Sequence, residues 1–301
     1  GAAGAGMQGR RTGESWNMQD GNSYLQFIFN GLRDLYPSLG LAPVTLSRLT
    51  IGTPGADMIV GGDSGDLVLA GAGDDVIHAG GGSDLVLGGW GDDTIFGGAA
   101  RDFLLGGTGA DMLHGGGGSN DLHGGAGDDQ LHGGTGDDLL LGGAGDDVLY
   151  GDGSAAGPDA TAAFAGGDDD VSGGAGNDRI FGDGMLTSVA AEEFDARPFA
   201  YDPGDDLLCG GDGADVIWGD GSMGYAERES AYSRVMGGDD KIWGGRDGDF
   251  LYGDGAAQIA VEGGDDRIWG GAGDDTILGD GDASPSSEFS ASVAGGDDWL
   301  P

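Results

Sequence analysis

The chain has 301 residues, of which 72 are glycine, and a formal net charge of −41 from 53 acidic residues against 12 lysines and arginines. Such a composition ordinarily gives a disordered chain, because like charges repel and glycine loses much backbone entropy on folding, and it excludes a basic surface for nucleic acid. The single cysteine, Cys209, excludes an intrachain disulfide, and no apolar run approaches the ~20 residues of a transmembrane helix.

The first 51 residues show no repeat. Residues 1–21 are expected to be a flexible lead-in, and residues 22–51 to form an N-terminal helical cap or linker. A helix is predicted within residues 24–36, with Asn22 or Ser23 as its N-cap and Pro37 as its terminator. Its apolar residues recur at helical spacing and are Leu25, Ile28, Phe29, Leu32, Leu35 and Tyr36.

Residues 52–150 consist of eleven nonapeptides without an insertion or deletion. Their frame is Gly-Gly-x-Gly-x-Asp-x-aliphatic-x, and residues 142–150, for example, read GGAGDDVLY. Position six is aspartate in every copy except at Asn120. Position eight is aliphatic in every copy, at Ile59, Val68, Ile77, Val86, Ile95, Leu104, Leu113, Leu122, Leu131, Leu140 and Leu149. A period this strict indicates one small structural unit stacked on itself.

The first six residues of a nonapeptide supply a turn, and the last three supply a short strand whose central aliphatic side chain points inward. Two nonapeptides would close one coil. Aspartates at position six of stacked turns can then share divalent cations, so that metal supplies much of the folding energy. The sequence therefore predicts an all-β solenoid that folds with metal and is expanded without it.

Residues 151–301 keep the repeat but interrupt alternate turns. Turns that begin at Gly151, Gly182, Gly219, Gly253 and Gly279 carry insertions, whereas those at Gly173, Gly210, Gly244 and Gly270 carry none. Because alternate turns stack on opposite edges of a solenoid, all insertions are expected on one edge.

This interpretation adds nine nonapeptides, whose position-six acids are Asp169, Asp178, Asp206, Asp215, Asp240, Asp249, Asp266, Asp275 and Asp298. The inserted turns also open as Gly-Asp-Gly, at Asp152, Asp183, Asp220, Asp254 and Asp280. These second acids either add metal ligands or form the turn.

Two surfaces are candidates for binding a partner. The inserted loops contain aromatic residues. Loops on one edge of a solenoid often form its binding face. The alternative is that these loops pack on one another and cover the edge. On one sheet the outward positions seven and nine form an apolar stripe at Leu67, Leu69, Leu85, Leu87, Phe103, Leu105, Leu139 and Leu141. An apolar surface of this extent is normally covered, so either the N-terminal helix or a second protein chain is expected on it.

Position nine holds rings at several other turns. His114 and His132 would be neighbours, either in a transition-metal ladder with His78 nearby or as plain exposed strand residues. Trp218, Trp243 and Trp269 also hold position nine, where they either bind sugars or pack along the face of a sheet.

The nonapeptide frame resembles the calcium-binding repeat of the RTX (hemolysin-type) family, which forms a right-handed parallel β-roll in secreted metalloproteases, toxins, adhesins and surface-layer proteins of Gram-negative bacteria. The resemblance covers residues 52–301 and implies a roll of about ten 18-residue coils with multiple Ca²⁺ ions. In that family each ion is held between two stacked turns. The ligands are the position-six carboxylates of both turns, carbonyls at positions two and four of the first, and carbonyls at positions one and three of the second.

Two sites illustrate what the resemblance implies for this chain. One would use Asp75 with Gly71 and Gly73, facing Asp93 with Gly88 and Trp90. Another would use Asp129 with Gly125 and Gly127, facing Asp147 with Gly142 and Ala144. The remaining position-six candidates of the regular half are Asp57, Asp66, Asp84, Asp102, Asp111, Asn120 and Asp138. Because Asn120 keeps an oxygen but loses a charge, the sites on either side of it are expected to be weaker.

No zinc-protease, serine-hydrolase or phosphate-loop motif occurs, so no enzyme is expected. We expect a calcium-binding scaffold and interaction module of an exported bacterial surface, adhesin, S-layer or fibre-type protein that folds on extracellular calcium. The alternative is the C-terminal secretion and folding module of a type I secreted enzyme or toxin whose catalytic domain lies outside this chain. Either protein would be secreted or lie at the surface of a Gram-negative cell, with a protein partner or self-association through the looped edge or the apolar sheet.

Overall fold

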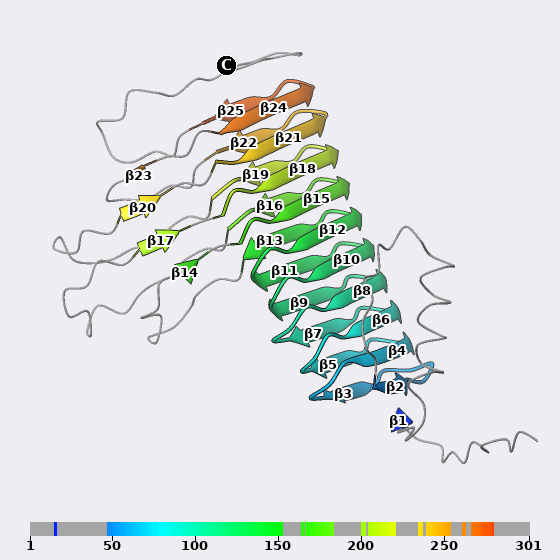
Figure 1. Ribbon diagram of the computed structural model, residues 1–301. Coiled ribbons are helices and arrows are strands. Elements are labelled where there is room, and N and C mark those ends of the chain that lie inside the picture. Colours follow the sequence, from blue (N-terminus) through cyan, green and yellow to red (C-terminus); the bar gives the residue numbers. More distant parts are fainter. Residues whose placement is uncertain are drawn as a thin grey trace, which may run out of the picture.

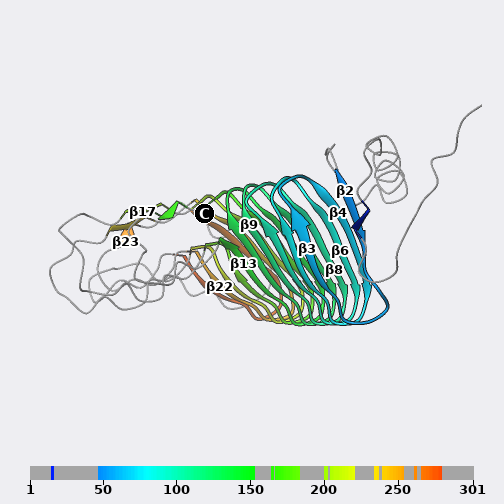
Figure 2. The same cartoon turned by 90° about the horizontal axis from the view of Figure 1, so that it is seen from below.

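The structure is a computed structural model that describes residues 15–16, 47–152, 164–165, 167–183, 200–202, 204–220, 234–236, 239–253, 261–262 and 266–279. Every regular element in these ranges is a β-strand. The chain alternates between two long sheets that lie face to face and forms a parallel β-roll (Figures 1 and 2). The helix expected at residues 24–36 and the last turn, with Asp298, lie outside the described residues.

One sheet, called sheet A, has eleven strands. In spatial order they are β1 (Ser15–Trp16), β2 (Arg48–Ile51), β4 (Asp66–Ala72), β6 (Leu85–Trp90), β8 (Phe103–Thr108), β10 (Asp121–Ala126), β12 (Leu139–Ala144), β15 (Asp170–Ala175), β18 (Leu207–Asp212), β21 (Lys241–Arg246) and β24 (Arg267–Ala272). All neighbours pair in parallel except β1, which pairs antiparallel with β2.

The other sheet, called sheet B, has ten parallel strands. They are β3 (Met58–Gly62), β5 (Val76–Gly80), β7 (Thr94–Gly98), β9 (Met112–Gly117), β11 (Gln130–Thr135), β13 (Val148–Asp152), β16 (Arg179–Phe181), β19 (Val216–Trp218), β22 (Phe250–Tyr252) and β25 (Thr276–Leu278). The turns that lead into sheet B carry no insertion and form the plain edge of the roll. The turns that lead into sheet A form the looped edge.

The strand register follows the nonapeptide period. Leu122 pairs with Leu140 in sheet A, and Leu131 pairs with Leu149 in sheet B, each 18 residues apart. The register is kept across the first insertion, because Leu140 pairs with Val171. The insertions therefore leave the stacking of the coils unchanged.

The inserted segments contribute a third sheet. Its four parallel strands are β14 (Phe164–Ala165), β17 (Ala200–Asp202), β20 (Arg234–Met236) and β23 (Val261–Glu262). These strands come from four successive insertions and lie one above another beside the looped edge (Figure 1). The expectation that all insertions emerge on one edge is therefore confirmed for these four. This loop sheet also shows that parts of the insertions pack on one another.

The roll begins ahead of the first nonapeptide. Strand β2 pairs with β4 in the register of the repeat and places Thr50 beside Val68, so it adds a strand that the glycine frame does not mark. Strand β1 then covers the outer edge of β2. Both strands fall within the stretches assigned from sequence to the lead-in and the cap or linker. An antiparallel strand at this edge satisfies backbone groups that would otherwise pair with another chain.

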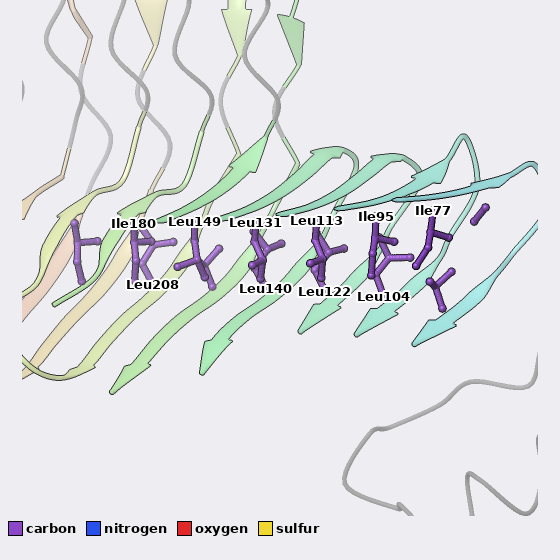
Figure 3. Packing of buried hydrophobic residues seen from close by; sticks show 14 of the residues in the cluster. Ile77, Ile95, Leu104, Leu113, Leu122, Leu131, Leu140, Leu149, Ile180 and Leu208 are labelled. Carbon is purple, nitrogen blue, oxygen red and sulfur yellow. The ribbon is translucent and has the colours of Figure 1, made fainter. Parts of the chain in front are cut away.

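The core is a cluster of aliphatic side chains that both sheets contribute to the space between them, as the labelled residues of Figure 3 show. Position eight supplies it throughout, and nearly all of these side chains have no exposed surface. Each coil buries two of them, which contributes roughly 3–6 kcal/mol. The same coil also buries two acidic residues at position six, and burial of charge opposes folding. A further interaction must therefore compensate the free-energy cost of burying the position-six carboxylates.

Candidate metal sites

Glycine shapes each turn by adopting backbone angles that other residues rarely adopt. In the turn before β7, Gly89 and Gly91 have φ of 123° and 116°, which lie in the left-handed region that glycine tolerates. A Cβ on Gly89 would also collide with the carbonyl oxygen of Gly71 in the preceding coil. In turns with this backbone, glycine stands at the second and fourth positions because the turns stack too closely for a side chain.

The position-six residues are brought together along the two edges as predicted. Within the described residues only Asp57 and Asp266, near the ends of the roll, are half-exposed. All others have at most 9% exposed surface: Asp66, Asp75, Asp84, Asp93, Asp102, Asp111, Asn120, Asp129, Asp138, Asp147, Asp169, Asp178, Asp206, Asp215, Asp240, Asp249 and Asp275.

From Asp75 onwards, one oxygen of each described position-six side chain joins consecutive coils. The N–H of Asp75 donates to Oδ1 of Asp93 at 2.8 Å, and the N–H of Asp93 donates to Oδ1 of Asp111 at 2.8 Å. The same bond crosses the first insertion, from the N–H of Asp138 to Oδ1 of Asp169 at 2.7 Å. Oδ1 is therefore satisfied by the protein itself.

The other oxygen, Oδ2, is buried and receives no hydrogen bond in most of these turns. This is true of Asp75, Asp84, Asp93, Asp102, Asp111, Asp129, Asp138, Asp147, Asp169, Asp178, Asp206, Asp215 and Asp249. Such a group costs free energy in its charged form. Burial accordingly raises the pKa of Asp129 to about 7 and that of Asp169 to about 10, and neighbouring carboxylates add to both shifts.

The unpaired Oδ2 faces a backbone carbonyl from the next coil. A Cβ placed on Gly88, at position one, would meet Oδ2 of Asp93 and would lie 2.7 Å from the carbonyl oxygen of Gly106. A Cβ on Gly97 would likewise lie 2.5 Å from Oδ2 of Asp102 and 2.8 Å from the carbonyl oxygen of Gly115. Negative oxygens thus converge without a donor between them, which suits a hard cation such as Ca²⁺.

Asn120 is a natural control for this arrangement. Its Oδ1 accepts the N–H of Asp102 at 3.0 Å, as an aspartate would. Its Nδ2 stands where the other turns have the unpaired oxygen, and donates to the carbonyls of Gly118 at 2.9 Å and Gly133 at 3.5 Å. These carbonyls belong to position four of the same turn and position one of the next. A positively polarised N–H group at this point therefore satisfies the oxygens that elsewhere require a cation.

The position-three carbonyls of the implied ligand sets are partly engaged. The carbonyl of Trp90 accepts the N–H of Gly73 at 2.7 Å, and that of Ala144 accepts the N–H of Gly127 at 2.7 Å. A carbonyl oxygen has two lone pairs, so each can still bind a cation. The complete ligand sets of these two sites stay predictions.

A second ladder was not anticipated from the sequence. At position five the later coil donates to the earlier one, from the N–H of Asp146 to Oδ1 of Asp128 at 3.0 Å and from the N–H of Asn177 to Oδ1 of Asp146 at 2.8 Å. These side chains are exposed. The sequence feature that could have predicted this ladder is the Asp-Asp pair at positions five and six of many repeats. The first aspartate joins coils at the surface, and the second faces the interior.

The histidines form part of a column of stacked rings on sheet B. His114 and His132 stack face to face, with centroids 4.8 Å apart and planes at 16°. Coordinating nitrogens point outward in the plane of an imidazole, so two stacked rings do not aim them at one ion. The column comprises His78, Phe96, His114, His132, Tyr150, Phe181, Trp218 and Tyr252. The arrangement favours strand-face packing over a transition-metal ladder.

The tryptophans are divided between the two sheets. Trp218 stacks between Phe181 and Tyr252 in sheet B, with centroids 4.5 and 5.4 Å away. Trp243 and Trp269 stack on each other in sheet A at 4.7 Å. Sugar binding uses the exposed face of a ring. Neighbouring rings occupy both faces of Trp218 and one face each of Trp243 and Trp269, so the geometry favours packing.

The apolar stripe of sheet A is covered at its N-terminal end. The outward side chains of Leu67, Leu85 and Phe103 are only 0%, 2% and 7% exposed, whereas Leu139 and Leu141, further along, are half-exposed. The expectation that this apolar surface is covered is therefore confirmed for Leu67, Leu85 and Phe103. The residues proposed from sequence to cover this surface lie outside the described part of the chain.

Within the described ranges, no three His, Cys, Asp or Glu side chains gather at one point to hold a metal. Each inter-turn position instead offers a carboxylate oxygen together with backbone carbonyls. The described residues contain no helix that is long and apolar enough to cross a membrane.

Comparison with known proteins agrees with this geometry. The family model of the RTX calcium-binding nonapeptide repeat matches residues 51–86, 87–122, 123–155, 165–184, 202–222, 234–257 and 253–283. These segments make up more than half of the chain. No curated protein sequence matches it.

Proposed function

Because this chain belongs to the family of RTX calcium-binding nonapeptide repeats, we propose that it is a calcium-folded scaffold and interaction module of an exported bacterial protein of the surface, adhesin, S-layer or fibre type. The repeats bind Ca²⁺, and proteins that carry them are typically secreted. The observation that supports the proposal best is the row of buried Oδ2 atoms without a donor along both edges. A chain with these acids is poorly stable without cations and becomes rigid when they are supplied.

Export explains why such a design is useful. Calcium is scarce inside cells and abundant outside them, so sites of modest affinity fill only after export. The chain would cross the envelope unfolded and fold at its destination. A rod held by cations then serves as a spacer or platform, and the described residues need no catalytic centre for this role.

The looped edge is our preferred interaction face. The loop sheet aligns the insertions in parallel register, with Tyr201 beside Phe164 and Val235 beside Tyr201. A series of loops held in register presents one extended surface, which is typical of binding faces on solenoids. The apolar sheet is a weaker candidate, because Leu67 and Leu85 are already buried.

A calcium titration followed by circular dichroism and light scattering tests the proposal, with Mg²⁺ as control. Calcium should convert a disordered chain into β-structure at concentrations at which Mg²⁺ does not. A chain that is equally folded in EDTA would overturn calcium-driven folding. Growth in mass on folding, abolished when residues 222–233 are replaced by a Gly-Ser linker, would support self-association through the looped edge. A chain that folds and stays monomeric would exclude this self-association.

We also propose that residues 17–46 cover the apolar stripe. Both ends of this segment are anchored at β1 and β2, the first strands of sheet A, next to the buried Leu67. Changing both Leu25 and Ile28 to serine should then expose the stripe and increase binding of a hydrophobic dye to the calcium-loaded chain. The paired change of Met58 and Val60, which are 76% and 60% exposed, to serine is the control. Equal dye binding by the Leu25 and Ile28 variant and the parent would contradict the proposal.

A further inference from the structure

In three inserted turns that the structure describes, the looped edge buries a second acid. Asp152, Asp183 and Asp220 hold position two of three successive turns and are 0%, 0% and 1% exposed. They lie one above another, because the N–H of Asp152 donates to the carbonyl of Gly182 at 3.1 Å and the N–H of Asp183 donates to the carbonyl of Gly219 at 3.2 Å. This second row is absent from the plain edge, where position two is glycine in all the described turns after the first.

The backbone of these turns differs from that of the plain edge. Gly174 and Gly211, at position two of plain turns, have φ of 118° and 124°, and a Cβ on either would collide with the carbonyl of the coil before it. None of the three aspartates has a positive φ; within the described residues Asp247 is the one non-glycine residue that does. The Gly-Asp-Gly opening therefore makes room for a side chain by changing the path of the turn.

The oxygens of this row distinguish turn formation from metal binding. Oδ2 of Asp152 accepts the N–H of Gly167 at 2.9 Å, which closes the base of its insertion, but its Oδ1 has no donor. Neither oxygen of Asp183 has a donor. Asp183 is thus a fully buried carboxylate whose oxygens no backbone N–H reaches, and turn formation does not account for it.

The carboxyl groups of Asp152 and Asp183 also lie within hydrogen-bonding reach of each other. Asp206, at position six, adds a further negative charge beside Asp183. Two carboxylates that face each other away from water require either a shared proton or a cation between them. Because all the groups are oxygen, the cation would be a hard divalent ion.

We propose that Asp152 and Asp183 hold a calcium ion of their own on the looped edge, separate from the ions at position six. Asp220 continues the row by one turn. The inference rests on the proposed calcium-dependent folding, and it gives the two edges different ligand sets. The looped edge would carry more carboxylate per ion and would keep its calcium at lower free concentrations than the plain edge.

The test counts bound calcium in the full chain by equilibrium dialysis and atomic emission. Asp183→Asn should bind one ion fewer than the parent. Asp205→Asn removes the same charge from an exposed position on the same edge, where an amide can still accept the N–H of Asp239, and should leave the count unchanged. Asp152→Asn should also lose one ion, although its amide oxygen can still accept the N–H of Gly167.

Two results would overturn the inference. If Asp152→Asn and Asp183→Asn both fold and keep the parent's count, the pair shares a proton and not a cation. If they lose no more affinity than Asp205→Asn in a terbium-luminescence titration, the row has no site of its own. Failure of the proposed function would give a different result in the dialysis experiment. The parent and Asp178→Asn, a position-six variant on the plain edge, would then bind equal numbers of ions.

Discussion

Changing one position-six aspartate to asparagine should have opposite effects on stability at low and at high calcium. Asp129 is fully buried, its Oδ1 accepts the N–H of Asp111 at 2.8 Å, and its Oδ2 has no donor. Asp129→Asn would reproduce the arrangement of Asn120, whose amide donates to two carbonyls. The variant keeps the bond between coils and removes the need for a cation.

The magnitude follows from the pKa of Asp129, which burial raises from 3.8 to about 7. At about 1.4 kcal/mol for each tenfold change, ionisation at neutral pH disfavours the folded state by roughly 4 kcal/mol at most, and relaxation of the site reduces this to roughly 2–4 kcal/mol. Asp129→Asn should therefore stabilise the calcium-free roll by that amount. The advantage should shrink by about 1.4 kcal/mol for each tenfold rise in free calcium above the dissociation constant, and reverse between about a thirtyfold and a thousandfold excess.

Urea unfolding in buffers of fixed free calcium, followed by circular dichroism, measures both effects. Asp128→Asn is the matched control, since Asp128 is exposed and its amide can accept the N–H of Asp146 as Asn177 accepts that of Ala214 at 3.0 Å. The control should follow the parent's dependence on calcium. The reasoning is refuted if Asp129→Asn keeps that dependence too, because the variant would then have lost no site.

Three further predictions follow from the same groups. In EDTA the chain should gain β-structure as the pH falls from 7 towards 4. A carboxyl whose folded pKa is raised, such as Asp129 at about 7, stabilises the fold at low pH and loses that contribution as the pH rises through the folded pKa. Circular dichroism spectra that are identical at pH 4 and pH 8 would contradict this. Asn120→Asp should bind one more calcium ion and stabilise the roll only when calcium is present, as equilibrium dialysis and urea unfolding would show, and an unchanged count would exclude a site there. His132→Phe should make the calcium-loaded roll less sensitive to acid. Burial lowers the pKa of His132 from 6.5 to about 4, so the stability that the neutral ring contributes is lost as the pH falls below about 6.5. Urea unfolding at pH 5 and pH 7.5 measures this, and a variant that loses as much stability as the parent between these pH values would contradict it.

Much of the roll can be predicted from the sequence because its contacts repeat at a constant separation. Position eight is aliphatic in every regular copy, and each of these residues is buried in the core. The alternation of turns placed the insertions on one edge, and the pairing of β14, β17, β20 and β23 agrees. In a solenoid each coil contacts only its neighbours, so the period of the sequence directly predicts which residues lie beside each other in the fold.

The candidate sites were only partly predictable. The repeat pattern identified the carboxylates at position six. It did not predict that Oδ1 of Asp93 accepts the N–H of Asp75 while Oδ2 of Asp93 has no donor. The direction of each oxygen depends on the backbone of two different coils. For the same reason the sequence left the second row undecided, and the structure separates Asp152, which closes its insertion, from Asp183, which has no such partner.

The sequence by itself determined the repeat, the core position, the acidic edges and the membership in a calcium-binding family, because these depend on the order of residues within one nonapeptide. Only the tertiary structure decided where the roll begins, which face of sheet A is covered, and which oxygens lack a partner. Strand β2 has no glycine frame and is recognised only by its pairing with β4. Leu67 sits at an outward position and is nevertheless buried. Such features depend on what the rest of the chain places beside a residue, which no local pattern contains.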